Sequence, residues 1–432
     1  LVECCCDYYM FMENGKLKWH GGKNEKNIKA IIKCLIPINV LRFIKYKLVQ
    51  KKIDKIGRMH VLPYDNECYP YGINIIGPIG MPTGLGQSCR LLTDVVSRCN
   101  IDYIIKDFSV YDYKDNIEKF LPKISEKLIY SINLIHVNMN EIHILLKRLG
   151  ETFLDKRYNI AFWLWEMENF PKEWVPLINI FDEIWTPSDF ISSSLKKVTN
   201  KPVLTMPYAV TAEYDAGLKR SDFNLPEDKF LFLMMYDSNS IRERKNPKAI
   251  IKAFKSAFKK TQDVGLVLKI SNISSKELNE LKDILKGYDI YFISEVFEKK
   301  VLNSLIRLAD VYVSLHRAEG FGLVLAEAML LGTPTIATDY SSNTEFQNYD
   351  SACMVGYDKV PVGRNIYPYK KNDLWAEPHV SEAAAFMLRL YEDREFYNSI
   401  KITAQKHIKT KTDIESITLL VSEHLGSLKK LS

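Results

Sequence analysis

From Tyr71 onward, short apolar runs alternate with longer stretches in which apolar residues recur at helical spacing. Apolar runs of about four to eight residues predict strands buried on both faces, as in parallel sheets covered by crossover helices. The first set of predicted strands covers residues 72–77, 132–137, 159–165, 183–187 and 202–207. A second set covers residues 229–236, 265–270, 289–294, 310–315 and 333–338. This repeated α/β alternation predicts two Rossmann-like domains that meet near residues 208–226.

Residues 1–69 follow a different pattern, because lysine and arginine are interspersed with isoleucine, leucine and valine in the segment 23–56. Pro37 divides this segment, since proline interrupts a helix. A basic amphipathic helix can lie on an anionic membrane surface, so residues 23–56 are a candidate for peripheral membrane contact. The alternative is an ordinary helix packed on the next domain, or a linker from a longer chain. We therefore expect residues 1–69 to form a basic N-terminal appendage or linker.

Composition and charge indicate a globular protein without a strong preference for nucleic acid. Apolar residues make up 47% of the 432 residues and charged residues 26%, as in ordinary soluble domains. The net charge of +6 suits phosphate-bearing ligands but is too small to indicate nucleic acid by itself, so we expect no nucleic-acid partner. The eight cysteines form no Cys-x-x-Cys pair, which favours a reducing cytosol and gives no metal site. No apolar run reaches the roughly 18 residues of a membrane span.

A glycine-rich stretch, "GPIGMPTGLGQSCR", directly follows the first predicted strand. Gly84 and Gly86 lead into a predicted helix, whose first N–H groups have no partner within the helix. Glycine lets the backbone approach a ligand closely, so this turn is one candidate anion site. A plain strand-to-helix turn explains the same residues equally well.

A second candidate follows the predicted strand at 229–236, where Arg242, Arg244 and Lys245 precede a helix. Asn246 is expected to cap this helix, and Pro247 to occupy its first position. Cations at a helix N-terminus are unfavourable unless a negative group binds there, and a diphosphate would supply the negative charge. The alternative is an exposed basic loop.

The third candidate is "HRAEGFGLVLAEAMLLGTPTIAT", which follows the predicted strand at 310–315. Its Gly-Phe-Gly turn offers backbone N–H groups to a phosphate, with His316 and Arg317 beside it and Glu319 facing the same crevice. Glu327 lies in the middle of an apolar helix, where a buried carboxylate is costly unless it is hydrogen-bonded. A sugar with adjacent hydroxyls would satisfy it. The alternatives are a basic neighbour for Glu327 and an ordinary core position for His316.

This last stretch resembles the E-x7-E signature of family 4 glycosyltransferases, the glycosyl transferases group 1, and within them the bacterial polysaccharide and mannosyltransferase-like members. The likeness extends over about residues 70–425 and includes "RKNPKAIIKAF", "FWLWEMENFPKEW" and "DEIWTPSDF". The resemblance implies the GT-B fold, in which two Rossmann-like domains face each other across a cleft. Residues 70–210 would form the acceptor side and residues 211–432 the nucleotide-sugar side, with the last helix able to pack back on the N-terminal domain.

The resemblance also implies roles for individual residues. Glu327 would bind the ribose hydroxyls of the donor, and Glu319 would lie near the transferred sugar. Lys245 would neutralise the diphosphate, and the turn Gly320, Phe321, Gly322 would cradle it. Many family members place an arginine five or six positions before this lysine, where the present chain has Asn239 and Ser240, so Arg242 or Arg244 would replace it. The expected catalytic residues are Glu319, Lys245, Arg244 and His316, and the expected donor-binding residues are Glu327, Gly320, Phe321, Gly322, Arg242, Lys269, Gly84 and Gly86. His136 and Glu166 fall on the acceptor side without an assigned role.

These expectations describe a retaining transferase that moves a hexose from a nucleotide-diphosphate sugar to a glycan or lipid-linked acceptor in cell-surface polysaccharide synthesis. The sequence contains no Asp-x-Asp motif, and the resemblance implies no cofactor and no metal. The protein would act in the cytoplasm, with peripheral contact at the inner face of the plasma membrane. Two alternatives stay open: a non-catalytic nucleotide-sugar-binding domain of a larger synthase, and a GT-B sugar-nucleotide epimerase.

Overall fold

The computed structural model describes residues 10–13, 16–19, 48–109, 117–238, 240–259 and 263–429. Of the predicted membrane-contact segment 23–56, residues 23–47 lie outside the described residues. Near the start of the chain, β1 (Met10–Glu13) and β2 (Lys16–Trp19) pair as antiparallel strands. In the part of the chain that the structure describes, no helix is both long and apolar enough to cross a membrane.

Residues 48–56 are helical and pack on the first of two α/β domains. Ile53 and Ile56 are buried in that domain's core, with 2% and 7% of their surface exposed. Gln50 Nε2 also donates a hydrogen bond of 3.0 Å to the carbonyl oxygen of Glu173. Residues 48–56 therefore form a helix packed on the next domain, which is the alternative to membrane contact considered from the sequence.

The first sheet contains six parallel strands in the order β4-β3-β5-β6-β7-β8. Its strands are β3 (Ile73–Gly77), β4 (Tyr103–Asp107), β5 (Ile132–Ile135), β6 (Tyr158–Phe162), β7 (Glu183–Thr186) and β8 (Val203–Thr205). Every residue of β3 and β5 is buried, as expected of strands covered on both faces. The order reverses between β3 and β5, so the loops that follow these two strands diverge and leave room for a ligand.

The second sheet also has six parallel strands, in the order β11-β10-β9-β12-β13-β14. Its strands are β9 (Phe230–Asp237), β10 (Val264–Ser271), β11 (Ile290–Ile293), β12 (Val311–Ser314), β13 (Thr335–Thr338) and β14 (Cys353–Val355). Here the order reverses between β9 and β12. The two sheets confirm the predicted pair of Rossmann-like domains.

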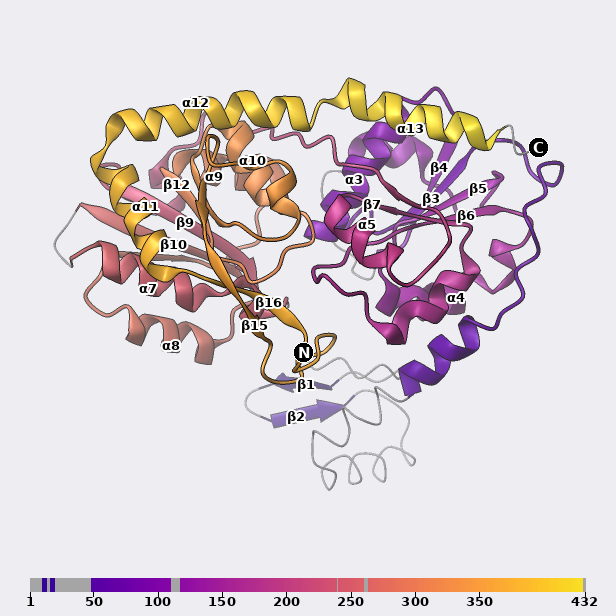
Figure 1. Cartoon of the computed structure of the whole chain (residues 1–432), viewed down its shortest axis with the longest axis horizontal. Helices are drawn as coiled ribbons and strands as arrows, with labels where there is room; N and C mark the ends of the chain where they lie inside the picture. Colours follow the sequence, from indigo (N-terminus) through magenta and orange to yellow (C-terminus); the bar gives the residue numbers. More distant parts are fainter. Residues whose placement is uncertain are drawn as a thin grey trace.

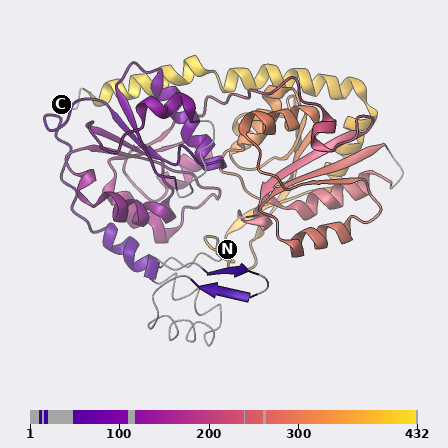
Figure 2. The same cartoon turned by 180° about the vertical axis from the view of Figure 1, so that it is seen from behind.

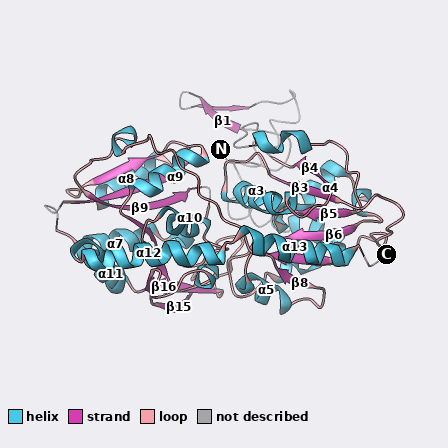
Figure 3. Cartoon of the chain, turned by 90° about the horizontal axis from the view of Figure 1, so that it is seen from above, coloured by secondary structure: helices cyan, strands magenta, loops and turns pink. Residues whose placement is uncertain are grey.

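Helices cover both sheets, and the two domains lie side by side (Figure 1, Figure 3). The first domain contains α3 (Gly84–Ser97), α4 (Ile142–Leu149) and α5 (Asp189–Lys196). The second contains α6 (Arg242–Lys245), α7 (Pro247–Ala257), α8 (Ser275–Ile284), α9 (Lys299–Leu308), α10 (Leu323–Leu331) and α11 (Val380–Glu392). Helix α7 packs on α11, and α10 packs on α9 and on α12 (Arg394–Lys411).

Two elements from the C-terminal part of the chain reach the first domain. Helices α12 (Arg394–Lys411) and α13 (Ile414–Leu428) run one after the other across both domains (Figure 1, Figure 2), and α13 packs on α3. His424 Nε2 lies 2.8 Å from Glu183 Oε1, which fastens α13 to β7. On the other side, an antiparallel hairpin of β15 (Tyr357–Pro361) and β16 (Leu374–Pro378) extends from the second domain.

The structure corrects two details of the prediction. Strands β4 and β14 of the two sheets were not predicted; in β4 the apolar run ends at Lys106 and Asp107. Asn246 precedes α7 as expected, but its side chain makes no capping hydrogen bond. Asn246 also ends α6 and adopts a left-handed conformation with φ 52°, which is not the extended conformation that a side-chain N-cap requires.

Candidate active site

The candidate site lies at the carboxyl ends of β9 and β12, where the strand order of the second sheet reverses. Strand β9 leads into α6, which carries Arg244 and Lys245, and β12 leads into the loop that carries Glu319. Residues 74 positions apart in the chain therefore meet here. This is the position that open α/β sheets use for ligands.

Glu319 is held between two cations. Lys245 Nζ donates to Glu319 Oε2 at 2.5 Å, and Arg244 Nη1 lies 3.4 Å from the same oxygen. Burial by itself would raise the pKa of Glu319, but Lys245 and Arg244 outweigh it and lower this pKa to about 2. Burial lowers the pKa of Lys245, while Glu319 opposes that change. The carboxylate is therefore ionised at neutral pH. It neutralises the positive charge of Lys245 and Arg244, and a bound diphosphate could replace it as their partner.

Arg244 also joins the two domains. Its Nη2 lies 3.8 Å from Oε1 of Glu166, which follows β6 of the first domain. Tyr369, in the β15–β16 hairpin, donates its hydroxyl hydrogen to Glu166 Oε2 at 3.2 Å. Sequence reasoning gave Glu166 no role and did not identify Tyr369. No local signal could have found Tyr369, because it lies 203 residues from its partner.

The Gly-Phe-Gly turn forms the N-terminal end of α10. Gly322 has φ 94°, a conformation that side chains disfavour, so a glycine is needed there. A side chain at Gly320 would approach Cγ of Glu166 to 3.6 Å, which shows how near this turn lies to the first domain. Phe321 packs edge-on against Tyr208 of the first domain, with the ring centroids 4.8 Å apart. The turn therefore places the N-terminal end of α10, where helices bind anions, beside an interdomain contact.

Glu327 is completely buried in α10. Lys299 Nζ from α9 lies 2.6 Å from its Oε1 as an ion pair whose geometry falls short of a well-aligned hydrogen bond. Burial raises the pKa of Glu327, and Lys299 opposes this rise. The basic neighbour considered from the sequence is thus present, and it is Lys299. The other oxygen, Oε2, has no hydrogen-bond partner among the described residues, so it can still accept from a ligand hydroxyl.

His316 is fully buried, and both of its ring nitrogens have partners. Nδ1 lies 3.0 Å from Ser314 Oγ, and Nε2 lies 3.1 Å from both the carbonyl oxygen of Tyr340 and Oδ1 of Asn343. Burial lowers its pKa, so the ring is predominantly neutral. These contacts correspond to the core-histidine alternative, and a catalytic role for His316 stays a prediction.

Two other predicted donor residues lie apart from the Glu319 cluster. Arg242 points toward α8, where its Nε lies 3.1 Å from Glu277 Oε1 and its Nη1 lies 3.5 Å from Glu280 Oε2. Lys269, in β10, is 7% exposed and donates to Ser271 Oγ. Of the two arginines that could replace the expected upstream arginine, the structure brings Arg244 to the site and not Arg242.

The glycine-rich turn of the first domain follows β3 at the switch point of that sheet. Thr83 caps α3 by accepting a 3.3 Å hydrogen bond from the N–H of Gly86. A side chain on Gly86 would lie 2.0 Å from the carbonyl oxygen of Met81, so this glycine is required by the fold of the turn itself. Gly84 has nothing within 4 Å of an added side chain, and its position is open to a ligand.

A buried chain of polar groups stands next to this turn. His136 Nε2 lies 2.6 Å from Ser88 Oγ, which is also hydrogen-bonded to the hydroxyl of Tyr208. Burial lowers the pKa of His136 to about 4. Nδ1 of this ring has no hydrogen-bond partner in the described part of the chain. Sequence reasoning named His136 without a role and missed Tyr208, which gives no motif.

Comparison with known proteins places these residues in a family context. Residues 216–352 match the family model "Glycosyl transferases group 1", and this range includes Arg244, Lys245, Glu319 and Glu327. A search of curated proteins found no match. The fold is similar to that of sucrose-phosphate synthase from Thermosynechococcus elongatus, with a TM-score of 0.60 and 15% identity over 84% of this chain and 100% of that one.

Two further proteins of known structure show the same fold. HepE from Anabaena, in complex with UDP and glucose, has a TM-score of 0.59 and 14% identity over 83% of this chain and 100% of that one. HepE is also known in complex with UDP-glucose. A glycosyltransferase from Rickettsia africae gives a TM-score of 0.58 with 14% identity, covering 84% of this chain and 99% of that one. At these identities the likeness concerns the fold.

Proposed function

We propose that this chain, which has the GT-B fold and whose residues 216–352 match the model "Glycosyl transferases group 1", is a retaining hexosyltransferase. It moves a hexose from a nucleoside diphosphate sugar to a glycan or lipid-linked acceptor. The observation that carries this proposal is the cluster of Lys245, Arg244 and Glu319 beside the N-terminus of α10. Residues 211–432 form the donor side in this proposal, and residues 70–210 form the acceptor side.

The cluster is suited to the departure of a nucleoside diphosphate. Negative charge develops on the leaving oxygen, and preorganised cations and helix N–H groups stabilise such charge most when they are desolvated. Lys245 and Arg244 supply the positive charge, and the turn from Gly320 to Gly322 supplies backbone N–H groups. When the diphosphate pairs with Lys245 and Arg244, the carboxylate of Glu319 no longer pairs with them and can face the positively charged sugar of the transition state.

Glu327 supplies the nucleotide contact. Its Oε1 is held by Lys299, and its Oε2, which has no hydrogen-bond partner within the described residues, can accept a hydrogen bond from a ribose hydroxyl. A buried carboxylate with one unpaired oxygen is unfavourable in the protein without ligand. A hydrogen bond from a ligand hydroxyl would therefore contribute favourable binding free energy.

We further propose a UDP-sugar as donor, because HepE, which shares the fold, binds UDP-glucose. The sequence resemblance to mannosyltransferase-like members makes GDP-sugars the donors to compare. The acceptor side would include Glu166 and His136 of the first domain, and Tyr369 reaches Glu166 from the hairpin of the second domain. A role in cell-surface polysaccharide synthesis, in the cytoplasm at the inner membrane face, follows from the same resemblance.

Titration calorimetry with UDP and GDP tests the donor site. We expect one nucleotide to bind the parent protein and Glu327→Ala to weaken it about tenfold to a hundredfold, as for the loss of hydrogen bonds to a charged group. Glu392→Ala, at the exposed end of α11, is the matched control and should leave the affinity unchanged. Equal affinity in both variants would refute the role of Glu327.

Product analysis separates the proposed transferase from the two alternatives. Acceptor-dependent formation of a glycoside identifies a transferase, and retention is read from the anomeric configuration of that product. A new nucleotide sugar formed without an acceptor would identify an epimerase. Nucleotide binding without turnover would identify a binding domain.

A further inference from the structure

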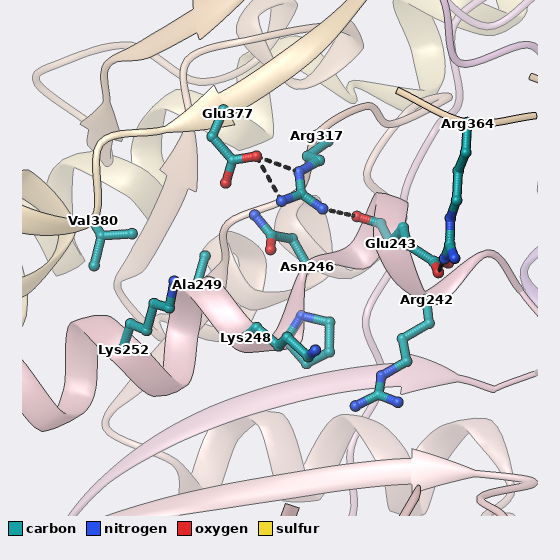
Figure 4. Close-up of a pocket in the computed structure, with 11 residues that line it drawn as sticks. Arg242, Glu243, Asn246, Lys248, Ala249, Lys252, Arg317, Arg364, Glu377 and Val380 are labelled. Carbon is teal, nitrogen blue, oxygen red and sulfur yellow. Dashed lines mark hydrogen bonds and ion pairs between the residues drawn. The ribbon is translucent and has the colours of Figure 1, made fainter. Parts of the chain in front are cut away.

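A second pocket lies in the second domain, apart from the Lys245–Glu319 cluster. It has a volume of about 350 Å³ and is lined by α6, the start of α7, Arg317, Arg364 of the hairpin and Glu377 of β16 (Figure 4). Neither Lys245 nor Glu319 lines it. The volume falls in the range of small-molecule sites, at roughly 300–1,000 Å³.

The start of α7 lines this pocket, where the N–H of Ala249 already donates to the carbonyl oxygen of Asn246 at 3.1 Å. Pro247 occupies the first position of the 11-residue helix, so N–H donors begin at Lys248. The positive end of the helix dipole lies at the same place, and it favours a bound anion.

Asn246 provides an independent sign of a missing partner. It is 3% exposed, and its Nδ2 has no hydrogen-bond partner among the described residues. Its side chain does not cap α7 but lies in the pocket between Arg317 and the first turn of the helix (Figure 4). Buried amide groups in native proteins almost always have a partner, so this N–H₂ group is expected to donate to a ligand acceptor.

The charges around the pocket favour an anion as that ligand. Arg317 binds Glu377 through Nε at 2.7 Å and Nη2 at 2.6 Å, and Arg364 pairs with Glu243, so each of the two carboxylates has its own arginine. Lys248 and Lys252 also line the pocket.

Lys248 and Lys252 are positive charges of the pocket that neither Glu377 nor Glu243 neutralises. They lie one helical turn apart on α7, are exposed, and have no ion-pair partner within the described residues. The net charge available to a ligand is therefore positive.

We propose that this pocket binds a phosphate group, as inorganic phosphate or as a phosphate monoester of a small hydroxylated molecule. The backbone N–H of Lys248 and Nδ2 of Asn246 donate to the phosphate oxygens, and Lys252 and Lys248 neutralise them. Glu377 and Arg317 stand where the remainder of a monoester would extend, and they can bind its hydroxyl groups. Arg242, expected from the sequence at the donor site, lines this pocket, but Lys245, Glu319 and Glu327 do not, so the two sites can be tested separately.

Calorimetric titration of the full chain with inorganic phosphate and with glucose 6-phosphate tests the proposal. We expect binding of at least one probe, weakened about tenfold or more by Asn246→Asp, which replaces the amide donor with a negative group of the same size. Lys252→Ala should weaken binding several-fold. Lys255→Ala, which removes an exposed lysine of the same helix outside the pocket, is the matched control and should have no effect.

The same titration with Lys245→Ala shows which site is being measured. Unchanged phosphate binding in this variant supports the separate pocket, whereas loss of binding would place the phosphate at the donor cluster and overturn the proposal. Absence of binding to the parent protein, or equal binding by the parent and Lys252→Ala, would overturn it as well. If Asn246→Asp does not fold, Lys252→Ala still decides. Tighter binding of glucose 6-phosphate than of phosphate would identify the monoester as the ligand class.

Discussion

Removing the positive partner of Glu327 should destabilise the protein in a pH-dependent way. Lys299→Met keeps a side chain of similar length in α9 but removes the charge 2.6 Å from Glu327 Oε1. Glu327 is fully buried, so its carboxylate would remain without a compensating charge. Breaking a buried ion pair from one side costs about 3–5 kcal/mol.

The expected loss can be followed by calorimetric melting at several pH values. For a domain of this size, about 3–5 kcal/mol corresponds to a decrease in Tm of roughly 6–20 °C. The pKa of Glu327 is already raised in the folded protein, and Lys299 is among the groups that oppose this rise. Without Lys299 the folded-state pKa should rise further, so the carboxyl group binds a proton more readily when folded than when unfolded. The variant should therefore regain stability as the pH falls from 8 to 5.5.

A second substitution shows whether the charge is the cause. Adding Glu327→Gln to Lys299→Met leaves no buried charge, and most of the stability lost at pH 8 should return. The reasoning is refuted if Lys299→Met melts like the parent protein at pH 8. It is also refuted if its loss is equal at pH 5.5 and 8 and the double variant shows no recovery.

Three other predictions concern single features. Gly322→Ala should lower the free energy of unfolding by about 1–2 kcal/mol, because φ is 94° there, and chemical denaturation measures this loss. Glu319 has a folded-state pKa of about 2, so it should stabilise the protein above about pH 4.5 and lose this effect as the pH falls toward 2. A Glu319→Gln variant should accordingly show a flatter acid-unfolding curve, and an unchanged curve would contradict the assignment. Ile53→Ala should cost about 2–5 kcal/mol in the same denaturation assay, whereas Leu48→Ala, which removes a side chain that is 56% exposed, should cost little; equal effects would show that the helix 48–56 is not packed as described.

Position along the chain predicts which residues come together where they follow directly after a strand. Arg244 and Lys245 come soon after β9, and Glu319 comes soon after β12. Because parallel strands align their carboxyl ends at one edge of the sheet, position along the chain was enough to predict that these residues meet. The same reasoning predicted the strands that are buried on both faces.

The sequence could not predict contacts that depend on packing between distant elements. Lys299 was not singled out, because it lies on a separate helix 28 positions before Glu327 and no pattern joins the two residues. Tyr369 reaches Glu166 from a hairpin that no motif predicts. Asn246 fitted the pattern of an N-cap, but its place between two consecutive helices set a backbone conformation that overrode this preference.

The β15–β16 hairpin makes the association of the two domains sensitive to ionic strength. Lys359 Nζ lies 2.6 Å from Glu168 Oε1, and Lys370 Nζ lies 2.5 Å from Glu173 Oε1, so two hairpin lysines are fastened to the first domain. Both lysines are about half exposed, and such pairs contribute about 0–1 kcal/mol and are weakened by salt.

Helices α12 and α13, in contrast, connect the domains covalently and through buried contacts on the opposite side. The ion pairs of the hairpin are therefore more easily broken by salt than the buried packing of α12 and α13. Raising the salt concentration should accelerate opening on the hairpin side while the path of the chain across the domains stays intact.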